Sequence, residues 1–372
     1  AEGLRARQKE AGRLIATLDG PEKEAAIAEV AELATAVKEA TAEADRLAAE
    51  FDQALLEVPN LVAPDAADGH TEADSVEIKR VGNPRSDGLD HATLGERLDI
   101  IDTARGAKVS GSRFGYIKGK GAMLEFSLVR WAMDHLVEAG FTPMLPPVLV
   151  REEALEGTGF FPEAREQVYE LPKDELFLVG TSEVPLAAYH GDEILDADAL
   201  PVRYAGFSTC FRREAGTYGK DTAGIFRVHQ FDKVEMFVFT TPDASADEHD
   251  RLLGVEEALV QELELPYRVV NVAAGDLGAS AAKKYDIEAW FPSEGTYREI
   301  TSCSNTTDYQ ARRLKVRMKT DEGNQVLHTL NGTACALGRT IIAILENHQR
   351  PDGSVEIPEA LRRYTGFDLI EP

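Results

Sequence analysis

Cysteine is scarce in this sequence, and its placement favours neither a disulfide framework nor a zinc site. The three cysteines, Cys210, Cys303 and Cys335, are odd in number and far apart along the chain. No Cys-x-x-Cys or Cys/His pair has the spacing of zinc ligands, so no zinc is expected. We therefore expect reduced thiols in or near a core, as in a cytosolic protein.

Long apolar runs and positive charge are also in short supply. No run approaches the roughly 18 apolar residues of a membrane span, and no signal peptide is visible, so we expect a cytoplasmic protein without a membrane partner. The 40 basic and 65 acidic residues give a net charge of −25. This excess argues against broad, unspecific nucleic-acid binding but allows a local basic patch. Neither GxGxxG nor GxxxxGK[ST] occurs at a strand-to-helix turn, which argues against Rossmann and P-loop nucleotide sites.

The first part of the chain is dominated by good helix formers. Residues 1–18 predict one helix, Gly20 and Pro21 a break, and residues 22–58 a second helix. Apolar residues of the second helix repeat with a heptad period, which is typical of a helical hairpin or coiled coil. Because the second helix is about twice as long as the first, we expect an antiparallel hairpin arm that is N-terminally incomplete, with sequence missing before Ala1.

The rest of the chain predicts a mixed fold. Residues 59–110 are rich in proline, glycine and aspartate and predict a linker and lead-in segment. A helix is expected from Ala122 to Ala139, and hairpin-like strands dominate after it. We therefore expect a catalytic domain over residues 111–372 of α+β class, with an antiparallel β-sheet flanked by helices.

An unusual number of cations for so acidic a chain lies in "FRREAGTYGKDTAGIFRVHQFDKVE", residues 211–235. The two ends of this segment alternate like strands, with the second strand running from Gly224. One shared face then carries two arginines, a phenylalanine and two carboxylates: Arg212, Glu214, Arg227, Phe231 and Glu235. Arginine binds phosphate and phenylalanine stacks on a base, so this face suits a purine nucleotide. The alternative is a solvated hairpin with cross-strand ion pairs.

Three further segments place polar groups at the ends of predicted strands. "ELFLVGTSEVPLAAYH" predicts a strand over 175–179, a glycine turn and a short helix, whose Thr and Glu could simply cap it. "YREITSCSN", residues 297–305, predicts a strand that becomes a polar turn, with surface exposure as the alternative. "VLHTLNGTACALGRTIIAILENHQ" predicts a strand over 326–330, a turn at Asn331 and Gly332, and then a helix. Arg339 near the start of this helix would favour an anion.

Together these segments resemble the class II aminoacyl-tRNA synthetases, and specifically the bacterial-type seryl-tRNA synthetases. The first class II motif resembles the helix from Ala122 leading to "GFTPMLPPVLV", the second "FRRE" through "RVHQFDKVE", and the third "NGTACALGRT". Family-specific pieces are "GTGFFP", "GTSEVPL", "EITSCSN" and "LENHQ". The resemblance covers essentially the whole chain, and these seven motifs in the right order make it very specific.

The resemblance implies a serine–tRNA ligase, which activates L-serine with ATP to seryl-adenylate and transfers serine to the 3′ end of serine tRNA. It also implies Mg²⁺ with the ATP, a homodimer through the helix and strand of residues 122–150, and an arm that reaches the tRNA. Two alternatives stay open: a specialised or inactive paralogue, and a serine ligase that charges a carrier protein. The long arm argues against the second, because such carrier ligases lack it.

Site residues follow from the resemblance position by position. The catalytic residues would be Arg212, Glu299 and Arg339. The serine pocket would comprise Thr181, Glu183, Arg212, Glu235 and Thr333. The ATP site would comprise Arg212, Arg213, Glu214, Val228, Phe231, Glu299, Ile300, Thr301, Ser302 and Arg339, with Mg²⁺ held by Glu299 and Ser302. The tRNA contacts would come from Arg5, Arg7, Lys9, Arg13 and Lys220. Two residues depart from many relatives near the site: Thr301, where serine is common, and Ala334, where glycine is common.

Overall fold

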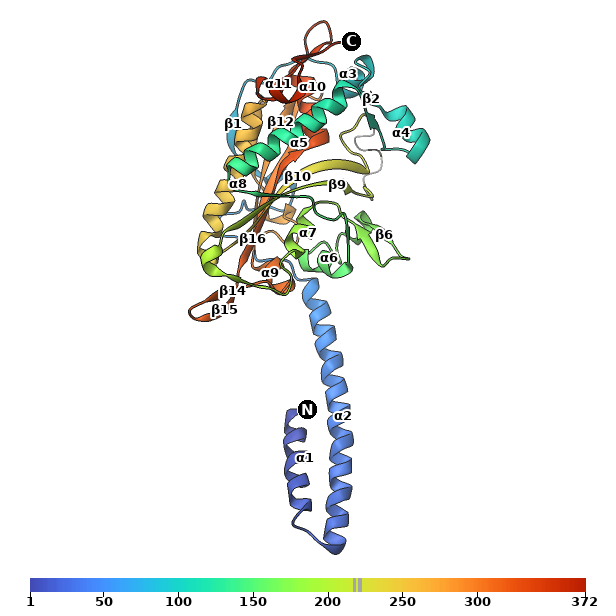
Figure 1. The fold of residues 1–372 in the computed structure, drawn as a ribbon, viewed down its shortest axis with the longest axis vertical. Coiled ribbons are helices and arrows are strands. Elements are labelled where there is room, and N and C mark those ends of the chain that lie inside the picture. Colours follow the sequence, from blue (N-terminus) through green and yellow to red (C-terminus); the bar gives the residue numbers. More distant parts are fainter. Residues whose placement is uncertain (217–218, 220–222) are drawn as a thin grey trace. The chain divides into compact units, whose positions relative to one another are not determined.

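The computed structural model describes residues 1–216, 219 and 223–372, and these form two compact units, Ala1–Val58 and Pro59–Pro372 (Figure 1). Lys220, one of the predicted tRNA contacts, lies outside the described residues. In the part of the chain that is described, no helix combines the length and the apolar character needed to cross a membrane. All three cysteines are buried.

The first unit is a hairpin of two helices, α1 (Glu2–Ile15) and α2 (Gly20–Leu56), as the sequence predicts. The break lies at residues 16–19, before the predicted position: Gly20 and Pro21 form the first turn of α2, with Asp19 at its N-cap. Arg5 Nη2 donates to Thr41 Oγ1 at 3.2 Å and joins the two helices. Further along α2, two of the apolar residues that repeat with the heptad period, Leu47 and Phe51, are 50% and 62% exposed.

An eight-stranded sheet dominates the second unit, in the order β1-β11-β12-β13-β16-β10-β9-β4. The β4–β9 pair is parallel, and the other neighbours pair antiparallel, as expected for a class II catalytic domain. The strands are β1 (Val76–Val81), β4 (Thr142–Met144), β9 (Val202–Phe211), β10 (Gln230–Thr240), β11 (Tyr267–Asn271), β12 (Lys283–Phe291), β13 (Thr296–Thr307) and β16 (His328–Ala336).

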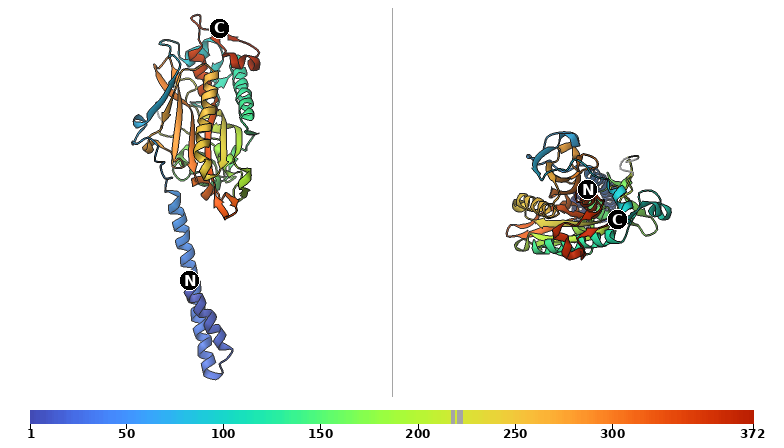
Figure 2. Two further views of the ribbon diagram at one scale, coloured as in Figure 1. Left: turned by 90° about the vertical axis from the view of Figure 1, so that its left-hand side faces the viewer. Right: turned by 90° about the horizontal axis from the view of Figure 1, so that it is seen from above.

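Three long helices cover one face of this sheet: α5 (Lys120–Glu138), α8 (Ser245–Glu262) and α10 (Leu337–Asn347). Two of them, α8 in yellow and α5 in green, lie alongside the strands in the left view of Figure 2. Side chains alternate across a strand, so Val234 and Met236 of β10 pack into this core while the residue between them, Glu235, points to the other face. The other face carries α7 (Glu183–Ala188) and α9 (Tyr309–Arg313).

Shorter elements complete the unit. The remaining α-helices are α3 (His91–Arg97), α4 (Thr103–Ser110), α6 (Glu152–Thr158) and α11 (Glu359–Thr365). The remaining strands are β2 (Ile101–Asp102), β3 (Tyr116–Ile117), β5 (Leu149–Val150), β6 (Tyr169–Leu171), β7 (Leu176–Leu178), β8 (Ile194–Asp196), β14 (Arg317–Thr320), β15 (Gly323–Val326), β17 (Val355–Glu356) and β18 (Leu369–Ile370).

The helix predicted over 122–139 is confirmed as α5, but three boundaries predicted around the polar segments are wrong. β10 begins at Gln230 rather than at Gly224, so Arg227 precedes the strand. β13 continues to Thr307 instead of ending in a polar turn. Its hydroxyls are accommodated by bonds to the next strand, such as Thr306 Oγ1 to the Thr329 carbonyl at 2.7 Å.

No turn occurs at Asn331 and Gly332, where the sequence predicts one. β16 runs straight through them to Ala336, and α10 begins only at Leu337. Asn-Gly is a strong local signal for a hairpin, but here the glycine serves a long-range contact. A Cβ on Gly332 would lie 2.8 Å from Oε1 of Glu256 on α8. The residue is small because a buried carboxyl group lies against it, not because the chain turns.

Candidate active site

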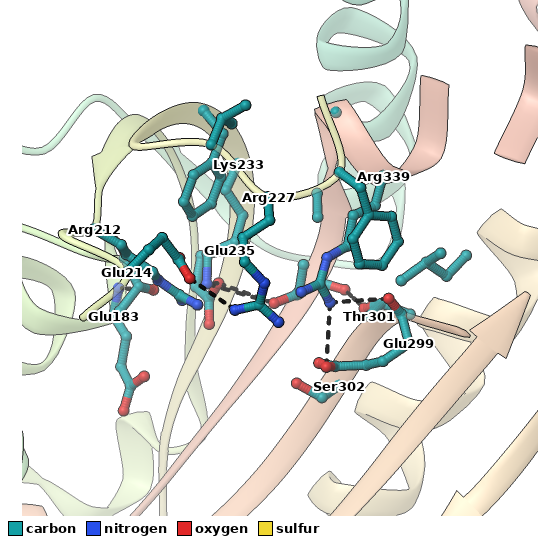
Figure 3. Close-up of a pocket in the computed structure, with 18 of the residues that line it drawn as sticks. Glu183, Arg212, Glu214, Arg227, Lys233, Glu235, Glu299, Thr301, Ser302 and Arg339 are labelled. Atoms are coloured by element: carbon teal, nitrogen blue, oxygen red, sulfur yellow. Dashed lines mark hydrogen bonds and ion pairs between the residues drawn. The ribbon is translucent and has the colours of Figure 1, made fainter. Parts of the chain in front are cut away.

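A single cavity on the face opposite α5, α8 and α10 gathers most of the residues predicted for the site (Figure 3). Those that line it are Thr181, Glu183, Arg212, Glu214, Val228, Phe231, Glu235, Glu299, Ile300, Thr301, Ser302, Thr333 and Arg339. Among the described residues, Arg213 is the predicted ATP contact that lies outside this lining. Its guanidinium lies 5.7 Å from the ring centroid of Tyr169 instead.

One end of the cavity is built from guanidinium groups and aromatic rings. β9 and β10 pair so that Phe231 lies opposite Cys210. Arg212 follows Cys210 by two residues, so its side chain lies on the same face as Phe231. The guanidinium carbon of Arg212 is then 5.3 Å from the Phe231 ring centroid. Arg339 lies 5.0 Å from the ring of Phe226, a residue that the sequence reasoning missed. Flat rings and planar cations facing one space are suited to a purine base.

Glu214 stands beside this aromatic end in an uncommon backbone conformation. Its φ of 52° lies in the left-handed region, which a glutamate rarely adopts and which often marks functional positions. Its Oε2 accepts from Nη1 of Arg227 at 2.7 Å, and Figure 3 shows this pair on the wall of the cavity. The carboxylate is therefore held in place at the cavity by both the backbone and an ion pair.

The opposite wall carries carboxylate and hydroxyl oxygens beside an arginine. Nη1 of Arg339 donates to the backbone carbonyl of Glu299 at 2.9 Å and to its Oε2 at 3.2 Å. Burial acts to raise the pKa of Glu299, but Arg339 and Lys284 outweigh it, and the pKa is lowered. The side chain is still 42% exposed, so its carboxylate remains accessible from the cavity.

This wall has the donor chemistry that Mg²⁺ prefers. Ser302 lies on the same strand as Glu299 and pairs in register with Asp286 of β12. Burial, followed by repulsion from Glu299, raises the pKa of Asp286 to about 7. Carboxylate and hydroxyl oxygens are ligands for a hard cation, which in nucleotide sites also binds phosphates and water. Within residues 1–216, 219 and 223–372, no group of three or more His, Cys, Asp and Glu side chains could hold a metal ion with protein ligands alone.

The third region of the cavity is a hydrogen-bonded network around two buried carboxylates. Nδ2 of Asn331 lies between them, 3.3 Å from Oε2 of Glu183 and 3.4 Å from Oε1 of Glu235. Nε2 of Gln310 donates to Oε1 of Glu183 at 2.8 Å, and Nζ of Lys233 is 2.5 Å from Oε2 of Glu235. The lysine, the asparagine and the glutamine are not among the site residues predicted from the sequence.

Glu183 is the most strongly perturbed acid of this network. Burial, followed by repulsion from Glu235, raises its pKa to about 7, and Lys233, Gln310 and Arg212 act in the opposite direction. The neighbouring Thr181 accepts a hydrogen bond from the backbone N–H of Glu183 at 3.1 Å. Its hydroxyl therefore supports the start of α7, as the helix-capping alternative predicts. Its side chain also lines the cavity.

The two departures from the family pattern occupy different places. Thr301 lines the cavity, and its hydroxyl donates to the carbonyl of Thr333, tying β13 to β16. Ala334 is 6% exposed and packs in the core under the helices. The expectation that Ala334 touches the site is therefore wrong, because it points to the other face of β16 from Thr333.

Comparisons with known proteins match both units. A family model described as "Seryl-tRNA synthetase N-terminal domain" matches residues 1–62, and one described as "tRNA synthetase class II core domain (G, H, P, S and T)" matches residues 167–348. The serine–tRNA ligase of Acidothermus cellulolyticus is 56% identical, over 100% of this chain and 89% of its own length. That of Thermobifida fusca is 55% identical, over 100% of this chain and 88% of its own length.

The fold also has similar neighbours among solved structures. Seryl-tRNA synthetase from Pyrococcus horikoshii, solved in complex with ATP, has a TM-score of 0.95 and 43% identity, over 100% of this chain and 89% of that one. The cytoplasmic serine–tRNA ligase of Naegleria fowleri, solved with AMP, has a TM-score of 0.88 and 34% identity, with the same coverage. Because a relative is 56% identical over 100% of this chain and 89% of its own length, the chain belongs to the serine–tRNA ligase family of class II aminoacyl-tRNA synthetases.

Proposed function

We propose that this protein is a serine–tRNA ligase, which activates L-serine with ATP and transfers the seryl group to the 3′ end of serine tRNA. One observation carries the proposal. The end built from aromatic rings and arginines, which suits a purine, and a small acidic pocket are parts of the same cavity. An enzyme that joins an amino acid to a nucleotide needs both in reach of each other. Its family membership agrees with this reading.

At the aromatic end, Phe231 stacks on adenine and Arg339 covers the other side and reaches the γ-phosphate. Glu214 accepts from the adenine amino group, and the backbones of Val228, Ile300 and Thr301 line the nucleotide. Phe231, Glu214 and Arg339 all line the one cavity, which supports this arrangement. A direct role for Arg213 stays a prediction.

Glu299 and Ser302 would hold Mg²⁺ through their oxygens, and the ion would neutralise charge on the ATP phosphates. Arg212 spans the junction of the two ends, where its guanidinium holds the α-phosphate and the serine carboxylate together. Two parallel N–H donors suit both groups. Its Nε already donates to the carbonyl of Gly180 at 3.3 Å, which orients the guanidinium toward the cavity.

The acidic pocket recognises serine by its ammonium and its hydroxyl. Thr181, Glu183, Glu235 and Thr333 supply the acceptors, and leaving them unpaired penalises alanine. In the first step a serine carboxylate oxygen forms a bond to the α-phosphorus as the bond to pyrophosphate breaks. In the second, the terminal ribose hydroxyl of the tRNA takes the seryl group and AMP leaves. Both steps rest on positioning and charge stabilisation, so no side-chain nucleophile is needed.

The units divide this work. Residues 1–58 form the tRNA-binding arm, residues 59–110 a linker and lead-in, and residues 111–372 the catalytic domain. The arm cations Arg5, Arg7, Lys9 and Arg13 are all exposed and can contact the tRNA backbone. We also propose a cytoplasmic location, where the tRNA is used.

A homodimer through residues 122–150 is the second part of the proposal. Large apolar side chains of this segment are exposed in the single chain: Met123, Phe126, Val137 and Leu145, at 48%, 68%, 51% and 83%. Exposed apolar side chains gathered on one segment are typical of a contact surface.

Aminoacylation with and without the arm tests the function. The full chain should charge serine tRNA with serine, and a chain of residues 59–372 should keep serine-dependent ATP–pyrophosphate exchange but lose most charging. Charging that survives loss of the arm would favour the ligase that serves a carrier protein. A calorimetric titration without any ATP binding would favour an inactive paralogue.

A further inference from the structure

Lys233 places a cation inside the acidic pocket, and neither the family motifs nor the proposed function gives it a role. It lies two residues before Glu235 on β10, so both side chains point to the cavity face. The lysine is 7% exposed and the glutamate fully buried. Nζ is 2.5 Å from Oε2 of Glu235 and donates to Oγ1 of Thr333 at 3.5 Å. Its ammonium is therefore fixed among the groups of the serine end.

The charges of this end do not balance without a substrate. Glu183 and Glu235 are both buried, and the amide of Asn331 links them. Lys233 pairs with Glu235 alone, whereas Glu183 has only neutral hydrogen-bond donors and no ion pair among the described residues. The nearby guanidinium of Arg212 is assigned by the proposed function to the α-phosphate and the serine carboxylate. Apart from it, two ionised carboxylates face one ammonium. The pocket thus has room for one further positive charge, which is what one serine ammonium brings.

We propose that Lys233 is a specificity-determining residue: it neutralises Glu235, so that Glu235 accepts the serine hydroxyl while Glu183 binds the serine ammonium. This assignment rests on the proposed function. Among the residues that the structure describes, Oε1 of Glu235 has only the long contact to Asn331, 3.4 Å, and so retains acceptor capacity for a hydroxyl. Without the lysine, Glu235 competes with Glu183 for the ammonium. This competition takes away the charged hydroxyl acceptor that rewards serine over alanine.

The main rival role for a lysine in such a cavity is phosphate binding, because an ammonium is a common partner for ATP phosphates. The contacts of Nζ with Glu235 and Thr333 place it instead at the amino-acid end. The two roles predict different kinetics. Loss of a phosphate contact raises the KM for ATP, whereas loss of the internal counter-ion changes the response to serine and alanine.

The test is ATP–pyrophosphate exchange by the full chain and by Lys233→Met, with serine or alanine as the amino acid. We expect the KM for serine to rise about tenfold and the serine-to-alanine ratio of kcat/KM to fall about tenfold, with the KM for ATP within about twofold of wild type. Lys233→Arg keeps the charge and should recover much of the ratio. Lys283→Met is the matched control, since it breaks a lysine pair with the 70%-exposed Asp65, a contact outside the cavity, and should leave the kinetics unchanged.

Each outcome decides between the roles. An unchanged serine-to-alanine ratio in Lys233→Met overturns the proposal, and so does an effect confined to the KM for ATP. Thermal unfolding and calorimetric ATP binding establish that the variant folds. If it does not, Lys233→Gln and Lys233→Arg are compared: a lower ratio in the glutamine variant supports the proposal, and equal ratios overturn it. Wild-type protein that fails to activate serine would instead overturn the proposed function itself.

Discussion

Serine activation should weaken as the pH falls from 8 to 6, because Glu183 must be ionised to bind the substrate ammonium. Burial, then repulsion from Glu235, raises the pKa of Glu183 to about 7 from an ordinary 4.5. The other groups that act on it, Lys233, Gln310 and Arg212, lower its pKa and do not reverse the shift. The ionised fraction thus falls from about nine-tenths at pH 8 to about one-tenth at pH 6. An ordinary glutamate would stay ionised throughout.

The expected result is a fall of about tenfold in kcat/KM for serine between pH 8 and pH 6, since this ratio reports on the free enzyme. ATP–pyrophosphate exchange at saturating Mg²⁺-ATP measures it. The kcat/KM for ATP at saturating serine is the control, because ATP and pyrophosphate also titrate in this range. A serine profile that is flat to pH 6, or that has the same slope as the ATP profile, would refute the reasoning.

The same shift has a consequence for stability. Since the folded protein holds the Glu183 proton more tightly than the unfolded chain, stability falls as the pH rises from about 4.5 to about 7 and stays lower above it. Raising the pKa of Glu183 from 4.5 to about 7 costs on the order of 3 kcal/mol of folding free energy at pH 8. Glu183→Gln should therefore raise the unfolding temperature at pH 8 while reducing serine activation about 100-fold. A variant that is less stable than wild type at pH 8 would contradict this account.

Three further predictions concern packing, ATP and assembly. Gly332→Ala places a methyl group 2.8 Å from Oε1 of Glu256 and should cost about 1–3 kcal/mol in chemical unfolding, whereas Gly254→Ala, with open space in helix α8, should stabilise by up to about 1 kcal/mol. Equal effects would show that the Glu256 contact is unimportant. Phe231→Ala should raise the KM for ATP about tenfold with the KM for serine nearly unchanged, because base stacking is lost. The reverse pattern would move Phe231 to the serine end. Phe126→Asp should shift the protein to monomers in sedimentation, and an unchanged dimer would exclude this surface.

Much of the fold was predictable because its signals are local. The heptads of α2 and the helical spacing of α5 each repeat over many residues, and both helices are confirmed. Alternation along the second strand also correctly placed Phe231 and Glu235 on one face, and both side chains line the cavity. These patterns depend on periodicity within one element, which the sequence displays directly.

What the sequence did not predict depends on contacts between distant elements. Asn331 and Gly332 read as a turn because the partner of the glycine, Glu256, is 76 residues away on α8 (332 − 256). Gln310 and Lys233 carried no local sign that each would lie against a carboxylate of the serine pocket. Strand pairing alone brings β10, β13 and β16 together, and a residue that acts through such pairing has no signature in its own neighbourhood.

The most direct test of the central claim is ATP–pyrophosphate exchange by the full chain with each amino acid in turn, at saturating Mg²⁺-ATP. The acidic pocket with its hydroxyl acceptors predicts strong exchange with serine and little with alanine, which lacks the hydroxyl, or with threonine, which adds a methyl group. Absence of exchange with serine, or faster exchange with another amino acid, would contradict the account.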